Sequence, residues 1–130
     1  MKFLSKCKDG GPESPVTAYV LIEIKSLFSV MLLHFGGTRE AFHSHAFNAV
    51  TLWLKGWAWE RTADGKLKFY KAGMLKYTPR GCFHRVEPVS EHDTWALTVR
   101  GPWNSTWQER KAGILTTLTN GRKIVAQEQI

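Results

Sequence analysis

Short runs of β-branched, aliphatic and aromatic residues, separated by glycine, proline and asparagine, follow one another along most of the chain. The stretch 16–35 is dense in Val, Ile, Leu, Phe and Thr, and it predicts two strands that a pair of glycines closes. A third strand is expected from Phe42 through Trp53 to a stop at Gly56. Because successive side chains of a strand point to opposite faces, the odd-numbered residues of this strand share one face.

Turn dipeptides predict further strands. Residues 57–60 and 66–70 flank Asp64-Gly65, which favours a tight hairpin because both residues tolerate positive φ. Asn120-Gly121 predicts a second hairpin in the same way. Residues 104–113 could instead hold a short helix, because they contain few helix breakers. The remaining apolar runs predict strands at 82–86, 94–100, 114–118 and 123–126.

Many short strands at turn spacing, with no long helical periodicity, predict an all-β sandwich or barrel. The 130 residues suit one domain, so a single folded unit over 1–130 is expected. Hydrophobic residues make up 43% and charged residues 22%, which excludes wholesale disorder. The net charge of +7 suits an anionic ligand, an acidic partner or a nucleic acid. Nucleic acid is the least favoured, because the basic residues form no cluster or binding motif.

The compartment is predicted from cysteines and apolar stretches. Two cysteines, Cys7 and Cys82, are too few for a disulfide framework or a four-thiolate zinc site, which favours a reducing environment. The longest apolar stretch, 16–33, is interrupted by Glu23 and Lys25, so it cannot cross a bilayer as one helix. The first residues lack the apolar core of a signal peptide. A soluble, cytoplasmic protein without a membrane partner is therefore expected.

Three of the five histidines carry the candidate chemistry. His43 and His45 are separated by one residue, so an extended strand directs both rings to the same face. His84 could supply a third nitrogen if its strand lies opposite. Imidazole is a common ligand of Zn, Fe, Ni and Cu, and three protein ligands with open positions are typical of a reactive metal site.

The spacing around these histidines resembles the two sequence motifs of the cupin superfamily. The first motif has glycine, five residues, HxH, three or four residues, glutamate, six residues and glycine; the second has glycine, five residues, proline, one residue, glycine, two residues, histidine, three residues and asparagine. Residues 37–56 fit the first motif except that Ala49 replaces the glutamate, and the matching residues are Gly37, His43, His45 and Gly56. Residues 73–88 fit the second except that Pro88 replaces the asparagine, and the matching residues are Gly73, Pro79, Gly81 and His84.

The resemblance implies a small single-domain cupin jelly roll, which is a β-barrel, with a mononuclear metal site ligated by His43, His45 and His84. Since Ala49 brings no donor atom, the ligand set is neutral and leaves the full 2+ charge on the ion, which favours a small anionic ligand or substrate. Such a set is similar to the three-histidine centres of thiol dioxygenases and to the three-histidine sites of zinc enzymes. A dioxygenase-like enzyme using Fe(II) is expected, with Zn, Ni, Mn or Cu as alternatives.

Strand alternation also predicts the pocket wall. The face of His43 and His45 continues through Phe47, Ala49, Thr51 and Trp53. Cys82 shares the parity of His84, so it is either a fourth ligand or a small buried apolar residue. On the strand 94–100, either Trp95, Leu97 and Val99 or the opposite set with Thr98 and Arg100 faces the pocket.

Charged residues near the motifs have expected roles as well. Arg39, Arg85 or Arg100 could bind a carboxylate or phosphate through two N–H groups of its guanidinium. Glu40 or Glu60 could accept a hydrogen bond from a ligand histidine.

Two further expectations concern partners. A non-catalytic interpretation keeps the fold but makes the protein a ligand-binding or assembly module, of a kind that phages also encode; the replaced glutamate and six tryptophans favour it. A homodimer is expected through the N-terminal strand, because an unprotected sheet edge favours pairing.

Overall fold

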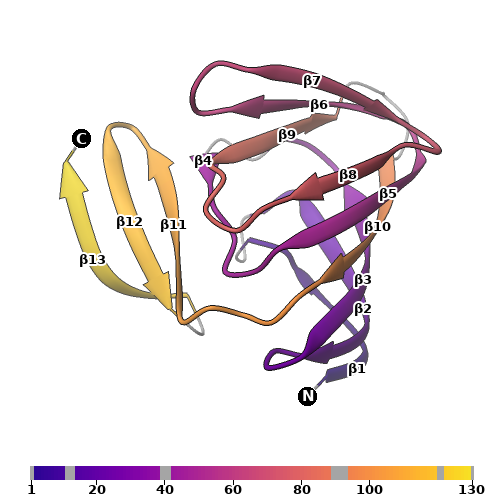
Figure 1. Ribbon diagram of the computed structural model, residues 1–130, viewed down its shortest axis with the longest axis horizontal. Coiled ribbons are helices and arrows are strands. Elements are labelled where there is room, and N and C mark those ends of the chain that lie inside the picture. Colours follow the sequence, from indigo (N-terminus) through magenta and orange to yellow (C-terminus); the bar gives the residue numbers. More distant parts are fainter. Residues whose placement is uncertain (1, 11–13, 39–41, 89–93, 120–121, 130) are drawn as a thin grey trace.

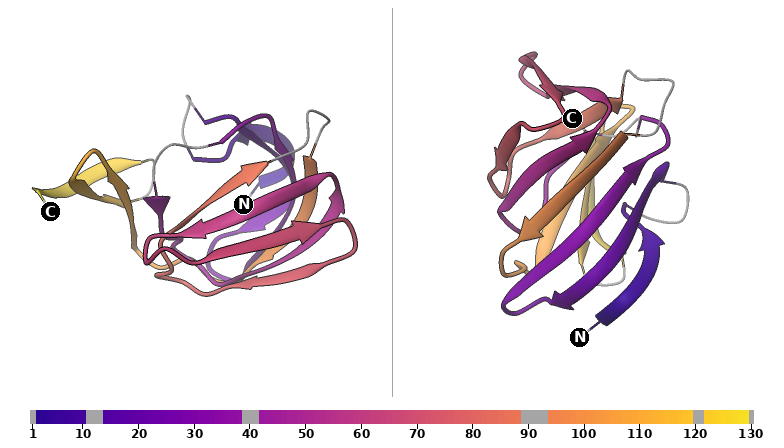
Figure 2. Two further views of the ribbon diagram at one scale, coloured as in Figure 1. Left: turned by 90° about the horizontal axis from the view of Figure 1, so that it is seen from above. Right: turned by 90° about the vertical axis from the view of Figure 1, so that its right-hand side faces the viewer.

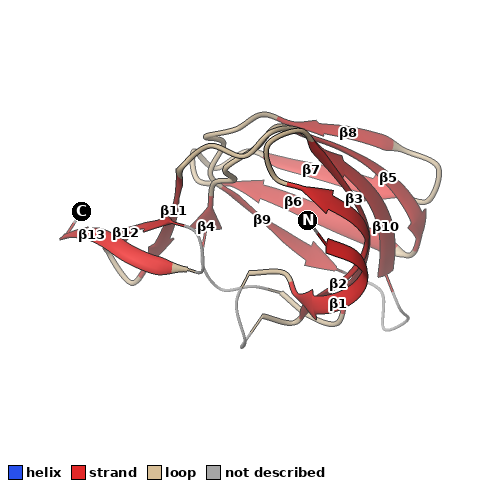
Figure 3. Ribbon diagram, turned by 90° about the horizontal axis from the view of Figure 1, so that it is seen from below, coloured by secondary structure: helices blue, strands red, loops and turns tan. Residues whose placement is uncertain are grey.

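The computed structural model describes residues 2–10, 14–38, 42–88, 94–119 and 122–129. Every regular element in these ranges is a strand (Figure 3), so the prediction of an all-β fold is confirmed. None of the described residues forms a helix long and apolar enough to span a membrane. The strands are β1 (Lys2–Lys8), β2 (Val16–Ile24), β3 (Phe28–Phe35), β4 (Phe42–His43), β5 (Ala49–Lys55), β6 (Trp57–Thr62), β7 (Leu67–Lys71), β8 (Leu75–Thr78), β9 (His84–Pro88), β10 (Thr94–Arg100), β11 (Thr106–Lys111), β12 (Ile114–Thr119) and β13 (Lys123–Gln129).

The strands form two sheets (Figure 1). The six-stranded sheet has the order β1-β2-β3-β10-β5-β8, and the seven-stranded sheet has the order β13-β12-β11-β4-β9-β6-β7. The described strands show no hydrogen-bonded ladder between the sheets, so the jelly roll is an open sandwich and not the closed barrel that was expected. In the six-stranded sheet, consecutive strands such as β2 and β3 pair as hairpins, whereas β10 inserts between β3 and β5.

The apolar core lies between the sheets and centres on Trp53, whose indole is fully buried. Its ring lies 5.8 Å from that of Tyr70 and 5.5 Å from that of Phe35, so it links the two sheets. Aromatic pairs at this separation add to the free energy gained by burying apolar area. The other buried members of the cluster are Val16, Ala18, Val20, Met31, Leu33, Ala58 and Ala96.

Strands β11, β12 and β13 form an arm that extends away from the sandwich (Figures 1 and 2). Among the described strands, β4 alone joins this arm to the remainder of its sheet. The alternative of a helix at 104–113 is wrong, because β11 pairs with β12 on one side and with β4 on the other. Those two ladders satisfy its backbone groups without a helix. Asn120-Gly121 lies outside the described residues, although the flanking strands β12 and β13 pair antiparallel.

The other local predictions meet a mixed outcome. The hairpin around Asp64-Gly65 is confirmed as β6 and β7, with Gly65 at a φ of 92°. The continuous strand from Phe42 to Trp53 is wrong, because β4 and β5 belong to different sheets. Between them the chain crosses over, and its backbone bonds to neighbouring segments: Ser44 N–H donates to the Gln108 carbonyl at 2.8 Å. This crossover positions the candidate site.

Candidate metal centre

The three histidines of the motifs come together between the sheets, each from a different local structure. His43 ends β4, His45 lies in the crossover after it, and His84 begins β9. His43 and His84 are register partners in adjacent strands. The ring centroids lie 4.9 Å (His43–His45), 4.8 Å (His43–His84) and 5.0 Å (His45–His84) apart, which makes a nearly equilateral triangle. The crossover, and not the single straight strand that was expected, therefore brings His43 and His45 to the same place.

The donor atoms of the triangle could hold one metal ion. One nitrogen from each ring lies within 4.8 Å of the others, and Nε2 of His45 is 2.8 Å from Nε2 of His84. Nitrogens bound at about 2.1 Å from a shared ion lie at most about 4.2 Å apart, so a small closing movement of the widest pair suffices. All three donors are imidazole nitrogens, a set that suits Fe, Zn, Ni or Cu.

A buried carboxylate fixes the orientation of His84. Nδ1–H of His84 donates to Oε2 of Glu60 on the neighbouring strand β6, with a distance of 2.8 Å. This bond leaves Nε2 of His84 directed at the other two rings. A carboxylate that accepts from the far nitrogen of a ligand histidine holds its tautomer and raises its basicity. Glu60 therefore has the role that was expected of either Glu40 or Glu60, whereas Glu40 lies outside the described residues.

Lys76 on β8 completes this buried group. Its ammonium forms an ion pair with the Glu60 carboxylate and lies 3.3 Å from Nδ1 of His84. Lys76 was not predicted from the sequence. Its neighbours Leu75 and Tyr77 are exposed while Lys76 is buried, which reverses the usual alternation of a surface strand. The sequence offers one weak sign of a special role for Lys76: it lies between Leu75 and Tyr77, so the lysine and these two large residues face opposite sides of the strand.

The charges of this group follow from burial and from its internal contacts. Burial alone would raise the pKa of Glu60, but the hydrogen bond from His84 and the charge of Lys76 outweigh it and lower the pKa to about 2. Burial lowers the pKa of Lys76, and Glu60 opposes that shift. Burial, together with the charges of His43 and His84, holds the pKa of His45 well below its ordinary value. His45 is therefore neutral at pH 7, the form that binds metals.

The pKa of Glu60 predicts an acid-sensitive stability of the metal-free protein. Because the folded-state pKa of about 2 is below the ordinary 4.5, the stabilisation is complete above pH 4.5 and is lost as the pH falls towards 2. The free energy of unfolding should fall by about 3 kcal/mol more in the wild type than in Glu60→Gln over this range. Urea unfolding at several pH values measures the difference, and parallel pH profiles would contradict the prediction.

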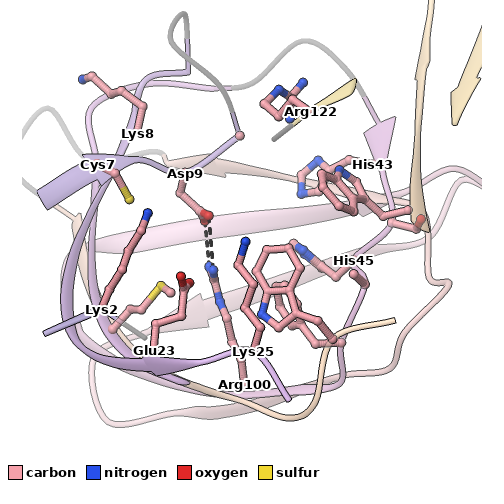
Figure 4. A pocket seen from close by; sticks show the side chains of 17 residues that line it. Lys2, Cys7, Lys8, Asp9, Glu23, Lys25, His43, His45, Arg100 and Arg122 are labelled. Carbon is pink, nitrogen blue, oxygen red and sulfur yellow. Dashed lines mark hydrogen bonds and ion pairs between the residues drawn. The ribbon is translucent and has the colours of Figure 1, made fainter. Parts of the chain in front are cut away.

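Two cavities that share lining residues adjoin the histidines, and Figure 4 shows the outer one. The outer cavity, of about 420 Å³, is open to solvent, and the inner one, of about 60 Å³, lies between the sheets. Both are lined by His43, His45, Phe47, Arg100 and Asp9. Cationic side chains outnumber acidic ones around the outer cavity: its acids are Asp9 and Glu23, and its cations are Lys2, Lys8, Lys25, Arg100 and Arg122.

No family model and no curated protein matches this sequence. Similar solved structures include a sugar phosphate isomerase from a cupin superfamily from Silicibacter pomeroyi, with a TM-score of 0.68 and 13% identity over 97% of this chain and 88% of that one. A Klebsiella pneumoniae protein with a double-stranded beta-helix domain has a TM-score of 0.63 and 18% identity over 80% and 90% of the two chains. An RmlC-like cupin from Shewanella frigidimarina has a TM-score of 0.57 and 17% identity over 73% and 81%.

The chain has a cupin fold. The cupin jelly roll expected from the two motifs is thus the observed architecture. Within this fold, Gly56, Gly73 and Gly81 all adopt positive φ, which explains why glycine stands at these motif positions.

The remaining pocket predictions can be located in the cupin fold. Ala49 lines the inner cavity, so the side chain at the glutamate position does face the centre without offering a donor. Thr98 and Arg100, and not the opposite parity of β10, face inward. Cys82 lines a separate cavity and lies outside the cluster of candidate donors. The predicted residues that line the inner cavity are Phe47, Ala49, Thr51, Trp53 and Arg100.

Proposed function

We propose that this cupin binds one divalent metal ion through His43, His45 and His84 and acts on a small anionic substrate in the adjoining cavity. The observation that carries the proposal is the triangle of three imidazoles at the wall of a cavity with an excess of cationic side chains. A neutral ligand set leaves the ion with its full charge, which attracts an anion to the same place.

The reaction class that we favour is dioxygenation with Fe(II). A bound Fe(II) ion would supply the redox chemistry that lets O₂ react with the substrate. Incorporating both oxygen atoms balances the four electrons taken up by O₂ against those lost by the substrate, so no second reductant is needed. The protein contributes an apolar cavity wall at Phe47 and a fixed orientation of His84 through Glu60.

Arg100 is the residue that we assign to binding the anion. Its guanidinium is buried and donates to both carboxylate oxygens of Asp9, at 3.2 and 2.7 Å. Nε of Arg100 is buried and has no hydrogen-bond partner among the described residues. The guanidinium also lies 4.7 Å from the centre of the Phe47 ring. An anionic group could share or replace Asp9 on this planar donor set, beside the histidines.

Replacing Arg100 should weaken anion binding. We expect Arg100→Gln to lower the affinity for an anion such as phosphate or succinate by about tenfold or more, because one charge-assisted pair is lost. Asp9→Asn should raise the affinity, since a competing carboxylate is neutralised. Calorimetric titration measures both effects. Arg61→Gln is the control, because Arg61 pairs with Glu87 and lines neither cavity; an equal loss in that variant would contradict the assignment.

The decisive experiment begins with elemental analysis of protein purified without oxygen. We expect iron at about one ion per chain, and O₂ uptake when carboxylate and phosphate compounds are added to the Fe(II)-loaded protein. Stoichiometric metal that survives alanine substitution of all three histidines would refute the centre. A bound metal without O₂ uptake would refute only the dioxygenase assignment.

A second candidate is isomerisation of a phosphorylated sugar at the same centre. The similarity to the Silicibacter pomeroyi isomerase, over 97% of this chain, and the cationic lining of the outer cavity support it. Conversion of sugar phosphates in the absence of O₂ distinguishes this candidate from the first. A protein that binds metal and anions but converts neither class of compound would be the non-catalytic binding module.

A further inference from the structure

The outer face of the six-stranded sheet is apolar across five adjacent strands. Strand registers align the outward side chains into two unbroken rows from β2 through β3, β10 and β5 to β8. The first row is Tyr19, Leu32, Leu97, Leu52 and Leu75, and the second is Ile22, Val30, Val99, Val50 and Tyr77. Figure 2 (right) is turned so that this side of the sandwich faces the viewer.

In β8 and at the end of β10, the sheet carries polar residues on its inner face and apolar residues on its outer face, the reverse of an ordinary surface strand. In β10, Thr98 and Arg100 point inward and are buried, whereas Leu97 and Val99 point outward. In β8, Lys76 and Thr78 are buried, whereas Leu75 and Tyr77 are 67% and 63% exposed. The polar cavity therefore accounts for the inward residues. Nothing in the described part of this chain covers the apolar rows on the outer face.

We propose that this face, named here the outer apolar face and defined by the two rows above, binds the same face of a second copy of the chain. A two-fold symmetric interface requires a surface that is complementary to itself. Each copy carries a net charge of +7, so copies repel through most surfaces. Neither row contains a charged residue, and two outer apolar faces can therefore meet without opposing like charges.

The exposed aromatic residues on the other sheet do not satisfy this condition. On the outer face of β6 and β7, Trp57 is paired with Lys71, and Arg61 is paired with Leu67. Two copies meeting there would bring these cations together. Two charges border the outer apolar face: Lys55 at the end of β5 is the register partner of Trp95, and Lys6 on the edge strand β1 has its ammonium 5.6 Å from the centre of the Tyr19 ring. Charges at the border suit the polar rim of an interface.

The size of the outer apolar face suits a dimer. Strands lie about 4.8 Å apart and rise about 3.3 Å per residue, so the two rows, with the exposed Phe28 and Leu54 that continue them on β3 and β5, cover roughly 24 by 20 Å. Side-chain corrugation raises the accessible area of such a rectangle towards the ~800 Å² that each partner contributes to a standard interface. Two sheets would pack face to face about 10 Å apart. The dimer contact is thus a sheet face, whereas the N-terminal strand β1 pairs with β2 of its own chain at the rim.

Light scattering of the full chain over a wide range of concentrations tests the proposal. We expect the wild type to have the mass of two chains. Val99→Lys, at the middle of the second row, should raise the dissociation constant about 100-fold or more, because each dimer would bury two unpaired lysines. Val99 is 46% exposed in the single chain, so the lysine can reach solvent there and the melting temperature of the monomer should remain near that of the wild type.

Leu67→Lys is the matched control, because Leu67 is 47% exposed but lies on the other sheet. It should remain dimeric. Val50→Lys, beside Val99 and 45% exposed, replaces Val99→Lys if that variant does not fold. A wild type that is monomeric at all concentrations would overturn the proposal. So would a folded variant of the outer apolar face that keeps the wild-type mass, or a Leu67→Lys protein that dissociates equally.

Discussion

Replacing His84 by alanine is expected to lower the affinity for a divalent ion by more than 100-fold, the largest change in metal affinity that we predict. His84 is the histidine whose Nε2 is fixed in direction, because Nδ1–H donates a hydrogen bond of 2.8 Å to Glu60. Losing a partner of a ligand histidine typically costs about 10–100-fold, and losing the ligand itself should exceed that. Fe(II) or Zn(II) titration of metal-free protein, followed by calorimetry, measures the loss.

His34→Ala is the control for a general effect of removing an imidazole. His34 lies on β3 with its ring 4.6 Å from that of Trp95, on the far side of the sheet from the centre. We expect this variant to keep the wild-type metal affinity. Equal affinities of the His84→Ala protein and the wild type would rule out the centre, whereas equal losses in both variants would mean that titrated metal binds elsewhere.

The features that could be predicted from the sequence depend on local geometry or on motif spacing. Asp64-Gly65 forces a turn whatever surrounds it, so the hairpin of β6 and β7 followed directly. The spacing of the cupin-like motifs correctly predicted that His43, His45 and His84 lie close together. The prediction that one straight strand carries His43 and His45 was wrong. The crossover after His43 depends on hydrogen bonds between Ser44 and Gln108, which lies far along the chain. No local sequence pattern predicts this crossover.

The features that could not be predicted depend on which strands become neighbours. Glu60 supports His84 because β6 pairs with β9, and Glu40 was an equal candidate until that pairing was known. The parity of β8 was ambiguous for a related reason. An apolar and polar alternation normally places apolar residues inside, but here the inner face surrounds a polar cavity, so Lys76 is buried and Leu75 is exposed. The helix alternative at 104–113 failed because β4 and β12 both pair with β11.

The second large effect is expected from Glu60→Leu, which should lower the free energy of unfolding by about 3–5 kcal/mol. The substitution leaves the ammonium of Lys76 buried without its carboxylate partner, and an uncompensated buried charge is strongly destabilising. Urea unfolding of the metal-free protein at pH 7 measures the loss. Lys76→Met in the same chain should recover most of it, because two apolar side chains of similar volume can replace a buried ion pair at little cost.

Measuring metal affinity should distinguish the effect of Glu60 on the stability of the protein from its effect on the orientation of His84. In the double variant Glu60→Leu and Lys76→Met, His84 still lacks an acceptor for Nδ1–H, so its affinity for a divalent ion should remain about 10–100-fold below that of the wild type. Glu60→Gln keeps a neutral acceptor at the same place and should lose less affinity than the double variant. A double variant that regains both stability and wild-type affinity would mean that Glu60 acts only as the counter-ion of Lys76 and does not orient His84.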